Sequence, residues 1–345
     1  MPKPDLSFPI PGKKHISTAD GTPVWKEQES SFWNRDIMKF FFPPEGDNRN
    51  TEGDTKMFGE NHAHIFMNAL DYRQAVKDHE KAPDEKLIRE HLKAYQEKNV
   101  SFVRDGGDYL RVSQRAREIA PEYGIDYRTP VFAIHKKGHY GGIVGRAFET
   151  MKEYTALVRE VKREGGDFIK IMTTGIMDFD TDGSITGTAL SFEEVREMVH
   201  IAHEEGFSVM SHTNGAKAVK EAAMAGVDSI EHGNYADEET VKIMAEQGTI
   251  WVPTITVVKN LIGKGRFSDQ VLLQIWEKGK TNIRKGYEAG VELALGSDAG
   301  AYLVPHGQGI LDEWACFKEI LGDKEDLKER LLRGESLIQG KFRKV

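Results

Sequence analysis

The chain has 345 residues, of which 39% are hydrophobic and 30% charged, and its formal net charge at pH 7 is −8. This length suffices for one large α/β domain or two ordinary ones, and the charged fraction indicates a soluble exterior. The acidic balance argues against nucleic acid or an anionic membrane surface as the main partner. We therefore expect a small-molecule substrate. Assembly into a homo-oligomer is compatible with the sequence.

Cysteine usage and the first residues narrow the class further. The chain has one cysteine, Cys316, so it can form neither an intrachain disulfide nor a thiolate zinc cluster. The opening "MPKPDLSFPIPGKK" lacks the apolar core of a secretory signal, and no window approaches a membrane-spanning apolar run. These features favour a cytoplasmic protein without a membrane as partner.

Residues 1–56 differ in pattern from the rest of the chain. "FFFPPEGDNRNTEGDTK" is typical of loops and turns, whereas "SSFWNRDIMKFFF" is rich in aromatic residues. We expect an N-terminal extension that packs on the following domain, residues 57–345, and is not an independent domain.

From about residue 57 onward, short β-rich runs alternate with longer amphipathic patterns. The predicted strands are "MFGENHAHIF", "VSFVRDGG", "RTPVFAIH", "DFIKIMTT", "FSVMSH", "VDSIEHG", "TIWVPTI" and "VELALGSDAG". Helices are predicted over residues 84–99, 111–123, 149–164, 191–205, 215–225, 237–247, 269–289 and 308–334. Ser191 and Glu194 fit a capping box at the start of one of these helices.

Eight strand–helix units favour an α/β fold of the (β/α)₈ TIM-barrel type. A doubly wound open sheet is the rival, but it usually has fewer units and often a glycine-rich turn after its first strand, which this sequence lacks. In a TIM barrel the chemistry lies at the carboxyl ends of the strands. The polar residues at those ends are His62, His64, Asp105, His135, His139, Lys170, His212, His232 and Asp298.

Several of these residues suggest a metal site. His62 and His64 are two apart on a strand, so both imidazoles would project from one face. Lys170 lies among apolar neighbours in "DFIKIM", where a buried ammonium is costly unless it is paired or chemically altered. Singly, each histidine could be a hydrogen-bonded strand cap and Asp298 a turn residue. Jointly, one site accounts for all of them.

The order of His-x-His on the first strand, lysine on the fourth, histidines on the fifth and sixth and aspartate on the eighth resembles the binuclear metal-dependent amidohydrolase superfamily. "GGDFIKIMTTG", "SHTNGAKAVKEAAMAGVDSIEHGNYADEETVKIMAEQGTIWVPTI" and "GVELALGSDAG" are similar to its prolidase-like and imidazolonepropionase-related branch, over roughly residues 57–321. The resemblance implies two divalent metal ions, usually zinc, with a carbamylated Lys170 as the bridge. The implied ligands are His62, His64, Lys170, His212, His232 and Asp298.

Two departures accompany the resemblance. Glu60 stands where the family usually has an aspartate two residues before the first histidine. Most members also carry a β-sandwich built from both chain ends, with a "PGK-x-AD" stretch that is not found in "LLRGESLIQGKFRKV". We therefore expect the accessory β-sandwich to be reduced or absent.

The resemblance also implies an activity. It implies cleavage of an amide bond in a dipeptide or N-acyl amino acid by a hydroxide that bridges the two metals, with Asp298 transferring the proton. His139 and Tyr235 are the candidate substrate contacts, although a solvent-exposed loop histidine and a packing tyrosine are the alternatives. Arg104 and Asp105 are within plausible reach of the substrate.

Other residues are not expected to take part in the chemistry. Glu231 should point to the face opposite His232, because side chains alternate along a strand. His306 follows the eighth strand and could line the entrance. Four further histidines lie in predicted helices and are expected at the surface: His79, His91, His200 and His203.

Two other functions remain open. The first is opening of a cyclic amide or lactone, or deamination of a ring, on the same metal centre. Deaminase-type members of the superfamily generally use one metal and lack the lysine, so Lys170 disfavours deamination. The second is a catalytically silent barrel that acts as a scaffold, which would contain no metal.

Overall fold

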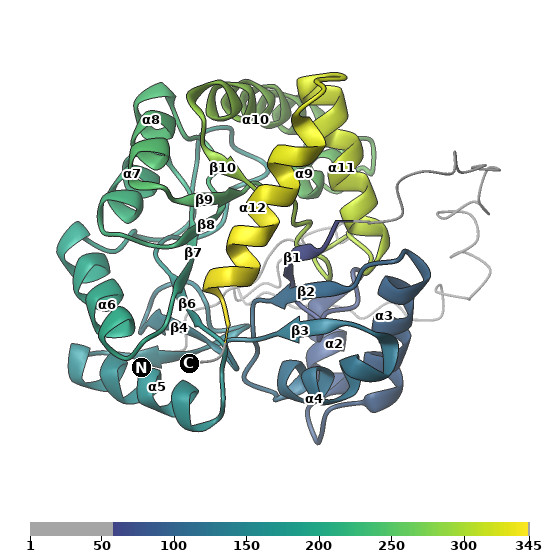
Figure 1. Ribbon diagram of the computed structural model, residues 1–345, viewed down its shortest axis with the longest axis vertical. Coiled ribbons are helices and arrows are strands. Elements are labelled where there is room, and N and C mark those ends of the chain that lie inside the picture. The colour runs from purple at the N-terminus through teal and green to yellow at the C-terminus, as the bar shows by residue number, and fades with distance from the viewer. Residues whose placement is uncertain (1–57, 344–345) are drawn as a thin grey trace, which may run out of the picture. The chain divides into compact units, whose positions relative to one another are not determined.

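Parallel strands alternate with helices along residues 58–343, the part of the chain that the computed structural model describes. Figure 1 shows the helices arranged around the strands. The chain divides into two units, Met1–Thr55 and Lys56–Val345, and the description here concerns the second. The predicted extension over residues 1–56 lies outside the described residues, so its packing stays a prediction.

The strands form two parallel sheets. The smaller sheet has the order β1-β2-β3 and the larger has the order β10-β9-β8-β7-β6-β4-β5. The strands are β1 (Glu60–Ala63), β2 (Phe102–Asp105), β3 (Asp126–Arg128), β4 (Ala133–Lys136), β5 (Gly145–Phe148), β6 (Ile169–Met172), β7 (Val209–Thr213), β8 (Ser229–His232), β9 (Ile250–Val252) and β10 (Glu292–Leu293).

The predicted α/β class and the parallel strands are therefore confirmed. Continuous hydrogen bonding of the strands into one closed barrel is not seen, because the strands form two separate sheets. At one junction, the sheets are joined by an isolated parallel bridge between Ala63 and Ala299. At the other, residues 129–132 separate β3 from β4. Within residues 58–343, the other isolated bridge is antiparallel, between Met177 and Ile185, and all strands belong to the two sheets.

Most predicted helices are confirmed to within a few residues. The helices are α2 (Tyr72–Asp78), α3 (Glu85–Glu97), α4 (Val112–Ile119), η1 (Ala120–Tyr123), α5 (Met151–Arg163), α6 (Phe192–Glu204), α7 (Ala216–Met224), α8 (Glu238–Gln247), α9 (Thr256–Leu261), α10 (Asp269–Ala289), α11 (Gln308–Leu321) and α12 (Leu327–Lys341). The single helix predicted over 308–334 is wrong, because Gly322, with φ of 71°, ends α11 and the chain starts again as α12.

The sequence patterns explain why these elements form. All residues of β1, β2, β6 and β7 are buried, as expected for parallel strands that are covered on both faces. In α5, the buried residues Tyr154, Val158 and Val161 recur at helical spacing. The predicted capping box of Ser191 and Glu194 is present at the start of α6.

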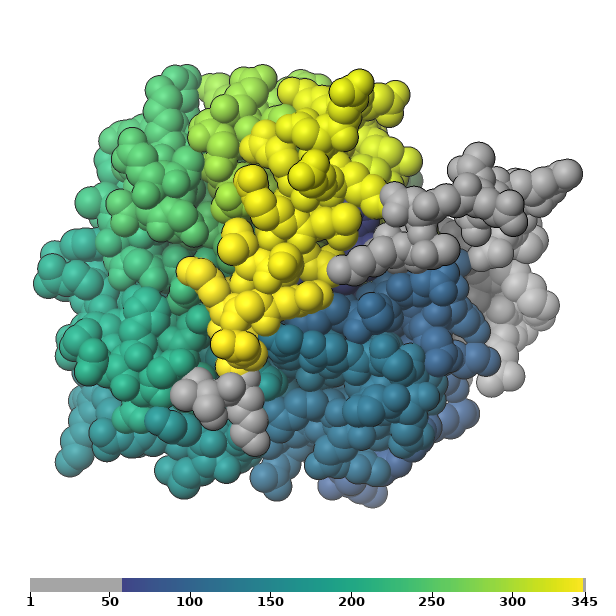
Figure 2. All heavy atoms as spheres, viewed as in Figure 1, coloured from purple at the N-terminus to yellow at the C-terminus, as the bar shows by residue number. Residues whose placement is uncertain are grey.

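The last helix covers one end of the strands and leaves the other end for the site. Lys341, at the end of α12, accepts a hydrogen bond at its carbonyl from Ser208 and forms an ion pair with Asp228. Ser208 and Asp228 directly precede β7 and β8, so this helix end lies at the amino ends of these strands. Figure 2 shows α12, in yellow, crossing this face of the molecule. No helix between residues 58 and 343 combines the length and the apolar character that membrane crossing needs.

Candidate metal centre

Histidines and an aspartate from both sheets meet at the carboxyl ends of the strands. Asp298 Oδ1 lies 3.5 Å from His62 Nε2 and 3.6 Å from His64 Nε2. One donor atom from each of His62, His232 and Asp298 lies within 4.8 Å of the others. Ligands at about 2.0–2.2 Å from a zinc ion are separated by a little more than about 3 Å. The donor atoms of this group are therefore near enough to one another to belong to one compact metal site.

A second histidine pair continues the cluster. The rings of His212 and His232 lie 4.7 Å apart between centroids, and those of His62 and His232 lie 5.0 Å apart. His212 lies within β7, and His232 ends β8. The four predicted histidine ligands and Asp298 therefore form one continuous group.

Lys170 of β6 lies next to this group. Its side chain is 1% exposed, and its Nζ has no hydrogen-bond partner among the described residues. Burial lowers the pKa of this ammonium to about 8, while the carboxylates of Glu231 and Asp298 partly oppose the shift. The positive charge of Lys170 in turn helps to lower the pKa of His62. The structure therefore brings together all six residues that the resemblance implied as ligands.

The electrostatics of the cluster suit metal binding. Burial, with the charge of Lys170, lowers the pKa of His64 and of His212 to about 3. Burial likewise lowers the pKa of His62 and of His232 well below 6.5. A neutral imidazole is the form that coordinates a cation. The buried atoms His62 Nε2 and His64 Nδ1 also have no hydrogen-bond partner in the described chain, so the residues present fit a divalent metal.

The backbone is strained at the same place. His232, Tyr235 and Asp298 have φ values of 67°, 63° and 62°, in the left-handed region that non-glycine residues rarely occupy. Each such residue costs about 1–3 kcal/mol, and residues of this kind gather at functional sites.

Glu231 was set aside in the sequence interpretation, and that interpretation is wrong. Its Oε2 lies 2.6 Å from His62 Nδ1, and both side chains are fully buried. The expectation assumed regular alternation through the end of β8. The left-handed φ of His232 breaks that alternation, so Glu231 and the ring of His232 both contact His62.

Further residues hold the ligands in place. Thr254 Oγ1 lies 2.7 Å from His232 Nδ1, and the carbonyl of Gly175 lies 3.0 Å from His212 Nε2. Asp105 accepts hydrogen bonds from the backbone N–H groups of Ile65 and Gly107, each at 2.7 Å. Asp105 is therefore engaged in holding the chain after β1, and not free to contact a substrate.

Arg104 is also not available to a substrate. Its side chain is fully buried, and its guanidinium donates to Glu231 at 2.9 Å and to the carbonyl of Asn61 at 2.8 Å. The expectation that it lies within reach of the substrate is wrong, because a fully buried guanidinium with these partners cannot also face an open site.

The two predicted substrate contacts, His139 and Tyr235, form hydrogen bonds with backbone groups outside the ligand cluster. His139 Nδ1 lies 2.9 Å from the carbonyl of Thr188, and the hydroxyl of Tyr235 accepts a hydrogen bond from Gly183 N at 2.9 Å. We find no hydrogen bond or ring contact from His139 to the ligand cluster within residues 58–343. Tyr140, the residue after His139, was not predicted to belong to the site. The centroid of its ring lies 5.1 Å from that of His212.

The remaining histidines divide into two groups. His200 and His203 are exposed, as predicted. His79 is only 2% exposed, and His91 is half-buried and stacks on His306 at 4.1 Å, so the surface prediction for both is wrong. His306 is buried and bonds Tyr95 and the carbonyl of Met67, so it does not line an entrance.

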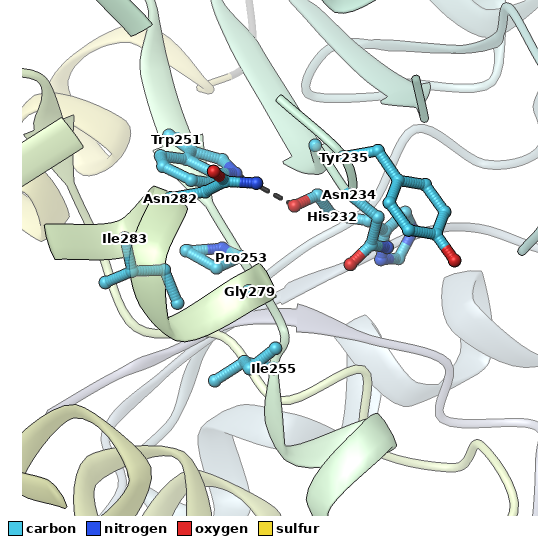
Figure 3. A pocket seen from close by; sticks show the side chains of 10 residues that line it. His232, Asn234, Tyr235, Trp251, Pro253, Ile255, Gly279, Asn282 and Ile283 are labelled. Carbon is cyan, nitrogen blue, oxygen red and sulfur yellow. Dashed lines mark hydrogen bonds between the residues drawn. The ribbon is translucent and has the colours of Figure 1, made fainter. Parts of the chain in front are cut away.

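A pocket lies beside His232. It is lined in part by Trp251, Ile255, Gly279 and Ile283, which belong to β9, the following turn and α10 (Figure 3). The indole of Trp251 donates to the carbonyl of His232 at 2.9 Å. Together with Thr254, this contact fixes both the backbone and the ring of His232.

The fold and the site together define a parallel α/β protein with a cluster of histidines and carboxylates at the carboxyl ends of its strands that could hold a divalent metal. Residues 60–311 match the model of the Amidohydrolase family, and the chain belongs to that family. The resemblance inferred from the strand motifs is confirmed.

Sequence relatives cover only part of the chain. Ochratoxinase of Aspergillus niger is 28% identical over 191 residues, which are 53% of this chain and 38% of the relative. A protein of uncharacterised function from Mycobacterium tuberculosis is 29% identical over 178 residues, 50% of this chain and 47% of the relative. The matched segments thus span less than half the length of these relatives.

Solved structures share the fold more extensively. A Xaa-Pro dipeptidase with bound methionine has a TM-score of 0.65 at 24% identity, over 82% of this chain and 75% of the other. The ochratoxinase of A. niger has a TM-score of 0.63 at 21% identity, over 79% and 68%. At these identities the similarity establishes the fold.

Proposed function

We propose that this protein is a metal-dependent amidohydrolase that cleaves an amide bond, with a dipeptide or an N-acyl amino acid as substrate. The proposal is supported by membership of a family that is generally metal-dependent, and by two similar proteins named as a Xaa-Pro dipeptidase and an ochratoxinase. The observation that carries it is the convergence of His62, His232 and Asp298, whose donor atoms lie within 4.8 Å of one another.

We assign the ligands as follows. His62, His64 and Asp298 would hold one divalent cation, and His212 and His232 would hold the second. The short distances from Asp298 to the first pair and the ring contact between the second pair support this division. Zinc suits the nitrogen and oxygen donors.

Lys170, as a carbamate, would supply the ligand shared by the two cations. Because its pKa is lowered to about 8, a substantial fraction of the amine is neutral at mildly alkaline pH. The Nζ lone pair attacks carbon dioxide, a new N–C bond forms, and one proton leaves to solvent. Counted from the ammonium form, two protons leave, one before the attack and one after it, as a C=O π bond of carbon dioxide opens. The product carries one negative charge, and a buried Nζ without a hydrogen-bond partner among the described residues becomes part of a two-oxygen ligand.

Two divalent cations at this position supply Lewis acidity and lower the pKa of bound water from about 15.7 towards about 7. Asp298 accepts the proton of the attacking water and delivers it to the leaving nitrogen. In the metal-free site, burial raises the pKa of Asp298 to about 6, which is close to neutral pH and suits a residue that must both take and release a proton.

The substrate contacts come from the loops around the cluster. His139 hydrogen-bonds the scissile carbonyl, and Tyr235 contacts the substrate from beside His232. For Tyr235, this requires release of its hydrogen bond with Gly183 N. Gly183 belongs to the segment between β6 and α6, so this segment moves when Tyr235 contacts the substrate.

We also propose that an eight-stranded barrel is completed by β1, β2, β3 continued by β4, β6, β7, β8, β9 and β10, with β5 as an additional strand beside β4. The isolated bridge between Ala63 and Ala299 supports this, as do the hydrogen bonds from Asn61 N to Leu295 O and from His64 N to Ala299 O. A closed arrangement of this kind would keep both ends of the ligand set, His62 and Asp298, in fixed register.

The test is a substrate screen with the metal-loaded full chain. A library of dipeptides and N-acyl amino acids is assayed for amine release, beside lactones and cyclic ureides. We expect turnover among the amides that is lost on chelation and restored by zinc. Hydrolysis confined to lactones or ureides would contradict the substrate class, and turnover unaffected by chelation would contradict the metal chemistry.

A further inference from the structure

We infer that Glu231 and Arg104 are positioning residues of the metal centre: together they hold the ring of His62 with Nε2 turned toward Asp298. The inference rests on the proposed function only in treating His62 as a ligand. It concerns how the chain prepares that ligand, and its test does not depend on the identity of the substrate.

The carboxylate of Glu231 contacts the ring of His62 directly. A carboxylate can only accept a hydrogen bond, so the 2.6 Å contact requires that His62 Nδ1 carries the proton. The lone pair of the neutral ring then lies on Nε2. This is the atom 3.5 Å from Asp298 Oδ1, and it has no hydrogen-bond partner among the described residues. Glu231 therefore selects the tautomer that coordination needs.

Glu231 is itself held in place by hydrogen bonds. Its side chain is fully buried, and a buried carboxylate is costly unless it is paired and hydrogen-bonded. Arg104 Nη2 donates to Oε1 at 2.9 Å and to Oε2 at 3.1 Å, and Ser229 Oγ donates to Oε1 at 2.6 Å. Both carboxylate oxygens are therefore occupied, which fixes the direction in which Oε2 accepts from His62.

Arg104 is held in turn by its own contacts. Its Nε donates to the carbonyl of Asn61 at 2.8 Å and its Nη1 donates to Ser229 Oγ at 2.9 Å. Its guanidinium lies 4.5 Å from the ring centroid of Phe342, directly after α12. Asn61, Arg104 and Ser229 belong to β1, β2 and β8, so this pair ties three strands together beneath the ligand cluster.

The alternative is that the pair serves packing alone. A packing role predicts that any replacement which preserves the fold leaves metal affinity unchanged. Positioning predicts that affinity depends on the hydrogen-bond acceptor itself. Glu231→Gln keeps the shape and an accepting oxygen but loses the charge, and Glu231→Leu removes the acceptor. A matched control is Glu313→Gln, since Glu313 is another fully buried carboxylate, which accepts from the backbone of Ile255 and Thr256.

The experiment titrates metal-free full-length protein with zinc by calorimetry, for the parent and the three variants. Loss of a hydrogen-bonded partner of a ligating histidine weakens metal binding by about 10–100-fold. We expect a loss of that size in Glu231→Leu, a smaller loss in Glu231→Gln and none in Glu313→Gln. Affinity equal to the parent in a folded Glu231→Leu would overturn the inference.

A second measurement covers the case in which Glu231→Leu does not fold. Nitrogen-15 NMR of histidine-labelled, metal-free parent protein reports which ring nitrogen of His62 is protonated, with His62→Gln used to assign the signal. We expect the Nδ1–H form, and a dominant Nε2–H form would overturn the inference. Failure of the proposed function alone would appear differently, as intact zinc binding and the Nδ1–H tautomer without amide hydrolysis.

Discussion

His62 Nε2 lies 3.5 Å from Asp298 Oδ1, and this contact joins the first strand of the described chain to the segment after the last one. The backbone reinforces it, because Asp298 N donates to the carbonyl of His62 at 2.8 Å. Glu60 accepts from Ser297 N at 2.7 Å and from His62 N at 3.2 Å. The two ends of the ligand set are therefore held by main chain as well as by side chains.

Asp298→Asn is predicted to separate metal binding from turnover. The amide keeps an oxygen that can coordinate but cannot take up a proton, so we expect a loss of about 10²–10⁴ in kcat with most of the metal retained. Metal analysis and steady-state kinetics on the same preparation check this. Turnover equal to that of the parent would rule out the proton-transfer role.

Lys170→Ala is predicted to lose metal and activity together. Without the bridging carbamate the second cation is held by two histidines only, so we expect roughly half the metal content of the parent, since structural and catalytic sites usually need three or more protein ligands. A short carboxylic acid such as propionate should restore part of the activity. Lys137→Ala is the control, because Lys137 is exposed and pairs with Glu149. Full metal content in Lys170→Ala would contradict the bridge.

The buried His306 is predicted to make stability depend on pH. Its ring donates to the carbonyl of Met67 at 2.9 Å and accepts from Tyr95 at 3.0 Å, and burial lowers its pKa well below 6.5. Below pH 6.5 the unfolded chain takes up a proton that the folded chain does not. The free energy of unfolding should therefore fall on acidification, by up to about 1.4 kcal/mol per pH unit for this one group.

Denaturant unfolding of metal-free protein between pH 7.5 and 5 checks the contribution of His306. We expect a shallower pH dependence in His306→Gln than in the parent. His200→Gln is the control, because His200 is exposed. Equal slopes for the parent and His306→Gln would show that this ring does not contribute.

Two serines at helix starts give a test of the local structure. Ser191 accepts a hydrogen bond from Glu194 N in a capping box at α6, whereas Ser268 makes no side-chain cap at α10. We expect Ser191→Ala to lower the free energy of unfolding by about 1 kcal/mol and Ser268→Ala to leave it nearly unchanged. Thermal or denaturant unfolding measures both, and equal effects would refute the capping assignment.

Much of the site could be predicted from sequence because its residues lie in short strands or shortly after them. Lys170 stands out as a charged residue among apolar neighbours, His62 is paired with His64 two residues on, and parallel strands bring their carboxyl ends to one edge. The helix patterns and the Ser191 capping box could also be predicted, because each depends only on residues that are near one another in the sequence.

The features that could not be predicted depend on backbone geometry or on long-range pairing. Glu231 was assigned to the face opposite His232 because regular alternation was assumed along the strand. This alternation fails at His232, which has a left-handed backbone conformation. Arg104 was expected within reach of the substrate, and only its contacts with Glu231 and Phe342 explain its burial. His91, which is half-buried, stacks on the buried His306 across the fold, and no local pattern indicates this contact.

The central claim is that side chains from both sheets hold two divalent cations at the carboxyl ends of the strands. The most direct test is a crystal structure of the zinc-loaded full chain with anomalous scattering measured at the zinc edge. We predict two anomalous peaks, one among His62, His64 and Asp298 and one beside His212 and His232, with continuous density from Lys170 Nζ between them. Peaks elsewhere, or none at this cluster, would contradict it.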